Sequence, residues 1–428
     1  MREEFLHFVW RHKLFDMINL ATVDGAAVQV LSVGNYTGLA GPDFVQAKMY
    51  IGKQLWYGSV ELHTKASDWY VHGHELDPHY NNVILHVVWE FDLPIFTSKN
   101  ACIPTVVLSG FVQTDLILRY EHLLAQKTHI NCFNLIDLVP QYHVSLWKER
   151  LIVERLNQKL VFFTELLKHT VNHWELVCMY ALAKGFGLNQ NGALFVEMIQ
   201  KIPTSYLLQA QRDPLDLEAV FYGLLGMLPY DVPDVYCRAL VHKYQDFQNK
   251  YQITAVFDRV HFAKLRPENF PTIRLSQLAH LLCEKPQLFS QITRLQSVGD
   301  LKDLLLVAAH PYWNTHYVFG VEGRERKKVT SAKFRDLLLI NVVLPMKFAY
   351  SKSVGDLVVD DYIELLEGLP AEQHQAAVMF KELGQEVESA FDSQAFLFLK
   401  KMYCDTNNCL NCHIGNYILR TDGNDNKY

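Results

Sequence analysis

Hydrophobic and polar residues alternate with two different periodicities along the chain. In the first part, Phe5, Phe8 and Val9 recur at roughly helical spacing, which predicts an amphipathic helix over residues 3–19. Shorter runs with the composition or alternation of strands follow it, and Gly52-Lys53 indicates a hairpin turn. These runs cover residues 28–33, 44–51, 54–63, 83–89 and 105–108.

From about residue 145 the hydrophobic positions take the spacing of helices. Residues 145–168, 174–186 and 193–201 carry helical spacing, and the chain continues in this way to about residue 403. The pattern therefore predicts an α+β chain, with an α/β N-terminal domain built on a mixed sheet and a mainly α-helical C-terminal region. We place the boundaries at 1–135, 136–402 and 403–428, where the last range is a Cys-rich segment with a polar tail.

Composition narrows the class of protein. Half of the 428 residues are hydrophobic and 12% are aromatic, enough for well-buried cores, and the length favours two or three domains. The net charge of −6 excludes a uniformly basic coat for nucleic acid.

The N-terminus begins with acidic residues and has no long apolar run, so it is unlike a signal peptide. We also see no apolar run of membrane-spanning length. We therefore expect a cytoplasmic protein without a membrane partner.

The chemically richest segment joins Pro42-Asp43 to the strand that contains Glu61, His63 and Lys65. Side chains two apart in a strand share a face, so these three project together. If Asp43 opens the preceding arm of the hairpin, its carboxylate comes near Glu61. Two carboxylates in one place repel each other unless a cation lies between them. We expect Mg²⁺ or Mn²⁺ at Asp43 and Glu61, with His63 or Lys65 orienting water.

Histidines and carboxylates remain dense beyond this strand. His72 and His74 are candidate metal ligands, and this density of groups suits Zn²⁺ or Mn²⁺. Taken singly, each residue has a plainer explanation: acids that cap turns, histidines bonded to backbone, and His86 as a satisfied core histidine on a strand. Taken as a group, they favour a metal site.

The cysteines suggest a second metal site. Cys404-x4-Cys409-x2-Cys412 offers three thiolates within reach of one loop, suited to zinc or to an iron–sulfur cluster. His413 could complete the set, but it directly follows Cys412 and simultaneous ligation by both would be strained. A distant cysteine could serve instead, and Cys132 is our preferred fourth ligand because it follows the strand-rich unit. The alternative is a set of reduced thiols without metal.

One segment of the helical region could contact substrate. Arg266 and Arg274 flank two prolines, and arginine forks suit phosphate or carboxylate groups. The plainer interpretation pairs Arg266 with Glu268 at an interface within the protein.

The N-terminal order resembles the PD-(D/E)XK nuclease-like superfamily, in which a helix precedes strands, Pro-Asp starts one strand, and Asp/Glu-X-Lys lies on the next. Pro42-Asp43 and Glu61 match these elements, and Glu4 matches an acidic residue that some members carry on the helix. His63 departs from the pattern, because it stands where the superfamily has lysine.

Over nearly its whole length the chain also resembles an uncharacterised bacterial family known only as the domain of unknown function DUF2851. The matching segments include 40–44, 60–63, 83–88, 266–274, 312–317 and 403–415. This second resemblance implies no activity.

Three functions follow as hypotheses. The first is a metal-dependent phosphodiesterase that acts on nucleic acid. The second is a nuclease-fold binding or scaffold protein that has lost catalysis, and the third is a zinc hydrolase built on His72, His74 and a carboxylate. A P-loop, a dinucleotide fingerprint and a nucleophile elbow are all missing from the sequence, which disfavours those chemistries.

Overall fold

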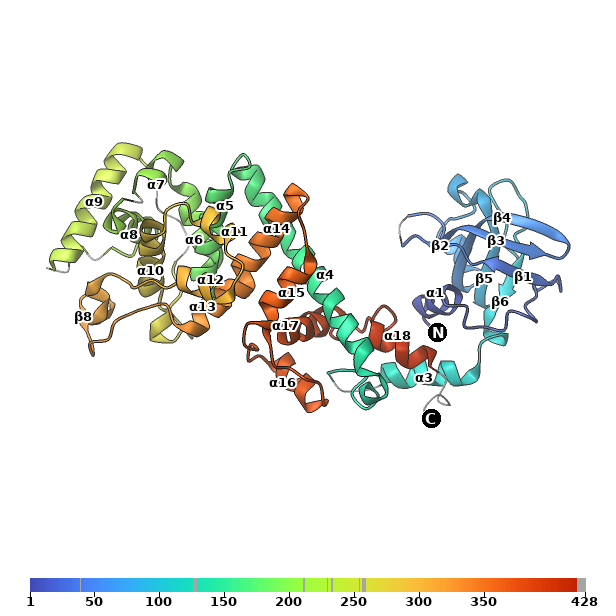
Figure 1. Cartoon of the computed structure of the whole chain (residues 1–428). Coiled ribbons are helices and arrows are strands. Elements are labelled where there is room, and N and C mark those ends of the chain that lie inside the picture. The colour runs from blue at the N-terminus through green and yellow to red at the C-terminus, as the bar shows by residue number, and fades with distance from the viewer. Residues whose placement is uncertain are drawn as a thin grey trace. The chain divides into compact units, whose positions relative to one another are not determined.

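The chain divides into two compact units in the computed structural model (Figure 1). The structure describes residues 1–421 except 39, 126–128, 211, 229, 232–233, 254 and 256–258. Unit 1 comprises Met1–Trp147 and Leu399–Tyr428, and unit 2 comprises Lys148–Phe398. Unit 2 is therefore inserted in the chain of unit 1.

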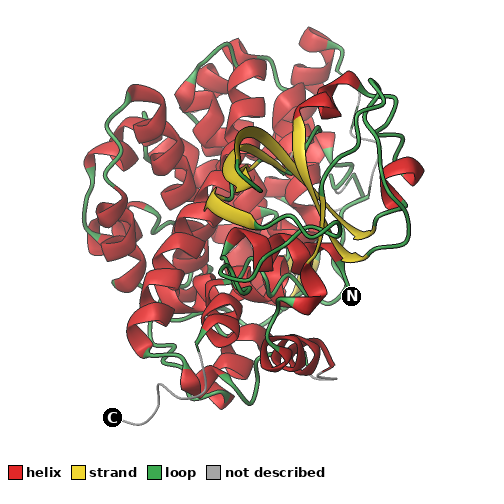
Figure 2. Cartoon of the chain, turned by 90° about the vertical axis from the view of Figure 1, so that its right-hand side faces the viewer, coloured by secondary structure: helices red, strands yellow, loops and turns green. Residues whose placement is uncertain are grey.

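Unit 1 is built on one mixed sheet, whose strands are yellow in Figure 2. The strand order is β1-β3-β4-β5-β6, with β2 beside β3. β1, β3 and β4 pair antiparallel, whereas β4, β5 and β6 run parallel to one another. The sequence located the main strands closely: β1 (Val28–Ser32), β3 (Phe44–Ile51), β4 (Gln54–Lys65), β5 (Val83–Glu90) and β6 (Thr105–Val107), to which the structure adds β2 (Asn35–Tyr36).

Helix α1 (Glu3–Arg11) packs on the sheet through Phe5, Leu6 and Val9, all fully buried. The predicted helix over 3–19 was too long. The chain turns at Lys13, whose φ of 55° is left-handed, and the N–H of Leu14 donates to the carbonyl oxygen of Val9. These bonds satisfy carbonyls at the helix end and stop the helix there.

The connection from β4 to β5 carries a second, smaller core. It contains α2 (Asp68–Val71) and η1 (Pro78–Asn82), and it buries Trp69 and Tyr80 beside Val88 of β5. The other helices of unit 1 are η2 (Leu108–Gly110), α3 (Thr114–Ala125), η3 (Ile136–Leu138), η7 (Lys400–Cys404) and α18 (His413–Arg420). Leu419 of α18 is fully buried in the same core as α1 and the sheet.

Unit 2 is helical, which confirms the predicted α+β class. Helix α4 (Gln141–His169) begins in unit 1 and continues into unit 2, and one small hairpin pairs β7 (His316–Val318) with β8 (Val321–Glu322). The other helices are α5 (Trp174–Phe186), α6 (Leu188–Lys201), α7 (Thr204–Ala210), α8 (Pro214–Leu224), α9 (Val235–Tyr251), η4 (Pro267–Asn269), α10 (Pro271–Glu284), α11 (Leu288–Arg294), α12 (Val298–Leu304), η5 (Pro311–Asn314), α13 (Ala332–Leu338), η6 (Leu339–Val343), α14 (Leu344–Val354), α15 (Val359–Glu367), α16 (Gln375–Glu382) and α17 (Ala390–Leu399).

One continuous helical stretch, Ala332–Val354, is long and apolar enough to cross a membrane by length and composition alone. It combines α13, α14 and a π-helical turn, η6. In the most apolar 18-residue window, 61% is buried inside the protein. This burial is typical of the core helix of a helical unit.

Candidate metal centre on the sheet

Asp43 and Glu61 face each other across the β3–β4 pair. Phe44 pairs with Val60, so Asp43 comes opposite Glu61 at the start of β3. The backbone N–H of Asp43 donates to Oε2 of Glu61 at 2.9 Å, and the N–H of Leu62 donates to Oδ2 of Asp43 at 2.9 Å. Backbone donors on facing strands therefore hold both carboxylates, and a bulge after Phe44 bends β3 beside them.

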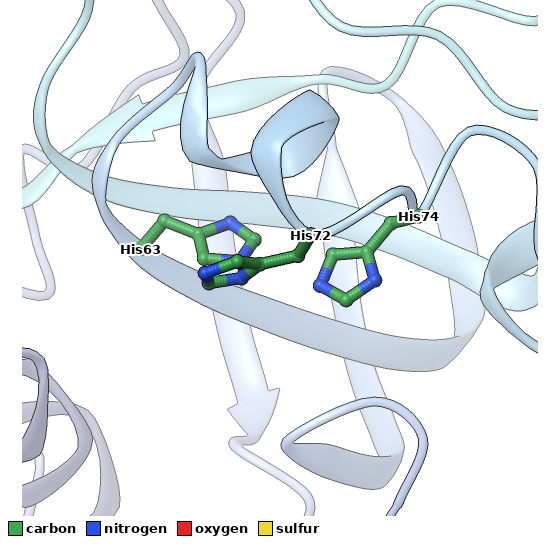
Figure 3. A group of neighbouring side chains, drawn as sticks. All are labelled: His63, His72 and His74. Carbon is green, nitrogen blue, oxygen red and sulfur yellow. Dashed lines mark hydrogen bonds between the residues drawn. The ribbon is translucent and has the colours of Figure 1, made fainter.

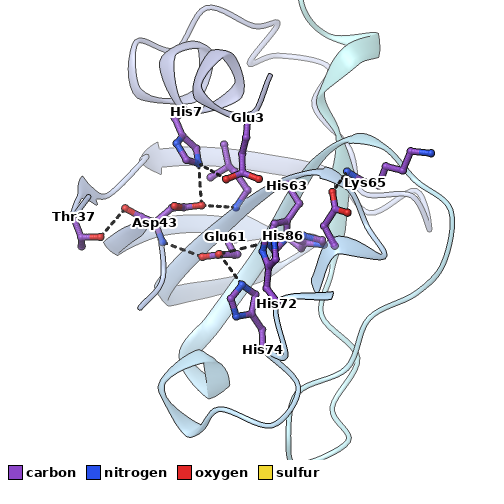
Figure 4. A network of polar contacts seen from close by, with 12 residues as sticks. Glu3, His7, Thr37, Asp43, Glu61, His63, Lys65, His72, His74 and His86 are labelled. Carbon is purple, nitrogen blue, oxygen red and sulfur yellow. Dashed lines mark hydrogen bonds and ion pairs between the residues drawn. The ribbon is translucent and has the colours of Figure 1, made fainter. Parts of the chain in front are cut away.

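The second oxygen of Glu61 faces histidines (Figure 4). Its Oε1 lies 3.3 Å from Nε2 of His74 and 3.7 Å from Nε2 of His63. Glu61 is only 5% exposed. Burial raises the pKa of Glu61, and the Asp43 carboxylate raises it further against the lowering effect of His74. A buried carboxylate between another acid and imidazoles is a place where a cation would be stabilised.

A tight turn after α2 returns two histidines to β4. The N–H of His72 bonds to the carbonyl of Asp68, and that of His74 bonds to the carbonyl of Trp69. Between them Gly73 takes a φ of 72°, a left-handed conformation that side-chain-bearing residues rarely adopt. The ring of His74 then stacks on Tyr80 with centroids 3.8 Å apart. The short helix and its glycine thus bring His72 and His74 to Glu61.

His63 connects two other histidines. Its Nδ1 lies 2.8 Å from Nε2 of His86, and its Nε2 lies 3.1 Å from Nδ1 of His72. Burial lowers the pKa of His63 to about 3 and that of His86 well below the usual range, so both rings are neutral at ordinary pH. If His63 donates its Nδ1–H to His86, the lone pair on Nε2 faces His72, as a metal-ligating imidazole requires.

The spacing of these atoms fits one ion. His63, His72 and His74 form a group whose ligand atoms all lie within 4.8 Å of one another (Figure 3). Nitrogen and oxygen ligands arranged tetrahedrally about zinc lie about 3.3 Å from one another. Nε2 of His63 lies 3.1 Å from His72, and Oε1 of Glu61 lies 3.3 Å from His74 and 3.7 Å from His63, all close to that value. Glu61 is not part of the group within 4.8 Å, so it borders the three histidines on the side of His63 and His74. A set of three imidazoles and one carboxylate suits Zn²⁺ or Mn²⁺ better than Mg²⁺.

Helix α1 adds two residues that the sequence reasoning missed. Nε2 of His7 lies 3.1 Å from Oδ2 of Asp43 and 4.0 Å from Oε1 of Glu3. Burial alone would lower the pKa of His7, but the contact with Asp43 outweighs burial and raises it. The i,i+4 spacing of Glu3 and His7 was the available signal. Glu4, the acid singled out from sequence, is exposed beside them.

Three other candidate residues lie apart from this cluster. The Lys65 side chain is half exposed, with Nζ 3.7 Å from Glu90, and it points away from the histidines in Figure 4. Arg266 is exposed in unit 2, and its neighbour Glu268 pairs with Arg326. Arg274 is buried, and its guanidinium donates to Asn269 and Gln277. The placement of Arg274 does not support a contact with substrate.

The four cysteines singled out from sequence meet elsewhere in unit 1. Cys132, Cys404, Cys409 and Cys412 all line one small cavity. His413 does not line it, and its Nε2 lies 3.1 Å from Nδ1 of His143. The structure thus brings together the four residues that the sequence reasoning grouped.

Fold and site together define an α+β protein with a candidate metal centre on its mixed sheet and a helical unit inserted in its chain. The family described as "Protein of unknown function (DUF2851)" matches residues 3–375, and the chain belongs to this family. No curated protein and no solved structure matches it.

Proposed function

We propose that this protein is a metal-dependent hydrolase that cleaves phosphodiester bonds in nucleic acid. The observation that carries the proposal is the group of His63, His72 and His74, with Glu61 in contact with His63 and His74. We assign the metal to these four residues and favour Zn²⁺ or Mn²⁺. Asp43 lies beside them and completes the acidic side of the centre.

A divalent cation there would supply a Lewis acid that polarises a phosphoryl oxygen and activates water. The residues around the cation would orient its ligands and transfer a proton. His86 fixes the orientation of His63, and the Asp43 N–H fixes Glu61. The contact with Asp43 raises the pKa of His7, which favours the protonated ring, and this ring could give its proton to a leaving oxygen.

The substrate class rests on the resemblance to PD-(D/E)XK nucleases. The helix, the Pro42-Asp43 step at the start of β3 and Glu61 on β4 occur in the expected order. His63 replaces the lysine of that pattern, and its low pKa favours a role as a neutral ligand. Water activation would then depend on the metal and on Asp43.

The test is cleavage of single- and double-stranded DNA and RNA by the full chain with Zn²⁺, Mn²⁺ or Mg²⁺. We expect cleavage with Zn²⁺ or Mn²⁺, and a loss in Glu61→Gln and His74→Ala that exceeds the roughly 10–100-fold typical of residues outside the first ligand shell. His79→Ala is the matched control, because His79 lies in the same unit with a side chain that is 83% exposed. Activity that survives Glu61→Gln would contradict the proposal.

Two further variants distinguish a metal centre built on the histidines from one built on the two carboxylates. A centre built on the histidines predicts that His72→Ala loses bound metal, whereas Asp43→Asn keeps metal and loses rate. A centre built on the two carboxylates predicts that Asp43→Asn loses the metal. Elemental analysis of the purified variants distinguishes the two results.

A non-catalytic binding protein is the second candidate. The observation that favours it is the position of Lys65, which pairs with Glu90 instead of reaching Glu61. Wild-type protein that holds the metal and binds nucleic acid, but cleaves none of the substrates, would support this second function and exclude the first.

A further inference from the structure

The four cysteines come from two distant parts of the chain. Cys132 lies just before η3, and its carbonyl accepts N–H groups of Leu135 and Ile136. Cys404 ends η7, Cys409 lies in the following turn, and Cys412 is the N-cap of α18. They line one cavity together, although more than 270 residues separate Cys132 from Cys404 along the sequence.

A hydrogen-bond donor points at one of these sulfurs. Nδ2 of Asn131 lies 3.5 Å from Sγ of Cys409. Burial raises the pKa of Cys412, against the lowering effect of the backbone of Ile414 and Gly415 and of the Trp147 side chain. Donors of this kind stabilise thiolate sulfur that is bonded to a metal. A set of thiols that only filled space would gain little from them.

The start of α18 is shaped to bring its backbone onto the cysteine loop. A Cβ on Gly415 would lie 2.2 Å from the carbonyl oxygen of Cys409, so only glycine allows this approach. Asn416 holds the same loop, because its Nδ2 donates to the carbonyls of Leu410 and Cys412. The loop that carries Cys409 and Cys412 is therefore held in one conformation around the cavity.

The separation of the sulfurs decides between one ion and a cluster. Four thiolates about 2.3 Å from one tetrahedral zinc lie about 3.8 Å from one another. In the part of the chain that the structure describes, the histidine trio is the group of possible ligands whose atoms all lie within 4.8 Å of one another, and no three of the cysteines meet this limit. In every set of three of these cysteines at least one pair of sulfurs is therefore farther apart than around one zinc ion, which favours a cluster.

We propose that Cys132, Cys404, Cys409 and Cys412 bind an iron–sulfur cluster as its four thiolate ligands. Each thiol releases its proton to solvent as its sulfur bonds to iron, and this ligation transfers no electron. The cluster joins the segment where the chain leaves unit 1 to the segment where it returns. Its role is then structural, and it is independent of the proposed hydrolase site at Glu61.

The test uses the full chain, purified without oxygen and analysed for iron, acid-labile sulfide and zinc. We expect iron and sulfide in equal amounts, with broad visible absorption that a reductant bleaches. Replacing any of the four cysteines by serine should remove most of the iron, while Cys102→Ser, at an exposed cysteine of the same unit, should keep it. Zinc without sulfide, or wild-type protein without metal, would overturn the cluster.

Variants that fail to fold are covered by a measurement on the wild type. Bound iron should protect the four thiols from alkylation while Cys102 reacts, and oxidative removal of the iron should expose them. Alkylation of all four thiols in protein that still holds its iron would contradict the proposal. Because the Glu61 site shares none of these ligands, a negative result here leaves the hydrolase proposal standing.

Discussion

Glu61 illustrates how one side chain can take two tasks. Oε2 accepts the N–H of Asp43, which fixes the carboxylate against the neighbouring strand, and Oε1 is left to face His63 and His74. Because one oxygen is anchored, the carboxylate has already lost rotational freedom, so metal binding costs less side-chain entropy. Side chains prepared in this way are typical of sites built on rigid strands.

Another buried glutamate, Glu218 of α8, lies in unit 2. Its carboxyl group meets Ser276 and Tyr236, and Tyr236 in turn accepts the indole N–H of Trp313. Burial raises the pKa of Glu218 from its ordinary value of 4.5 to about 8. In the folded protein the group is therefore protonated at neutral pH, whereas in the unfolded chain it is ionised.

This difference predicts a pH dependence of stability. Because the folded-state pKa is raised, the stabilisation is fully present below pH 4.5 and is lost as the pH rises towards 8. Relative to Glu218→Gln, the wild type should lose roughly 1.4 kcal/mol of unfolding free energy per pH unit across that window. Urea unfolding of both proteins at several pH values measures it. His280, whose Nε2 lies 3.8 Å away, is present in both, so parallel curves would contradict the assignment.

At the scale of elements, the hydrophobic pattern predicted the features that local sequence encodes, namely the strands and the hairpin. Gly52-Lys53 and the alternation around it located β3 and β4, since a hairpin and its strands are encoded by neighbouring residues. Asp43 and Glu61 were paired correctly for the same reason. The end of α1 was missed, because an apolar pattern continues past Lys13, where the chain turns. His7 was missed because its partner Asp43 lies 36 residues away.

Helix packing in unit 2 offers a prediction at this scale. A Cβ on Gly223 of α8 would lie 2.2 Å from the ring of Tyr244 in α9, which is buried. Gly223→Ala should therefore lower the unfolding free energy by about 1–3 kcal/mol through overpacking. Gly299→Ala in α12 is the matched control, where a Cβ meets only Ser297 Oγ at 3.8 Å. It should stabilise by up to about 1 kcal/mol. Equal urea midpoints for the two variants would refute the packing argument.

The division of the whole molecule was harder to see from sequence. Residues 403–428 were set apart as their own segment, whereas the structure assigns the end of the chain to unit 1. Cys132 was nonetheless grouped with the C-terminal cysteines, because three thiolates need a fourth ligand and Cys132 follows the strand-rich unit. An insertion leaves no periodic signal at its two ends, so hydrophobic pattern alone does not reveal it.

Unit 1 should fold without the insertion. The rings of Trp147 and Tyr403, on either side of it, lie 5.2 Å apart between centroids, so a short linker can join residues 1–147 to 399–428. We expect this shortened protein to unfold cooperatively and to bind metal at Glu61. Residues 1–147 alone should be less stable, because Leu419 is missing from the core. Circular dichroism and elemental analysis check both proteins, and an unfolded joined protein would contradict the expectation.

The insertion also sets the order in which the protein can be completed during synthesis. The ribosome releases every strand of the sheet long before Leu419, yet that residue belongs to the same core. About 250 residues of unit 2 are made in between, which takes roughly 12–50 s at translation rates of about 5–20 residues per second. Throughout this interval the apolar surface that α18 covers on α3 and η3 stays exposed, so we expect newly made protein to pass through a partly folded intermediate.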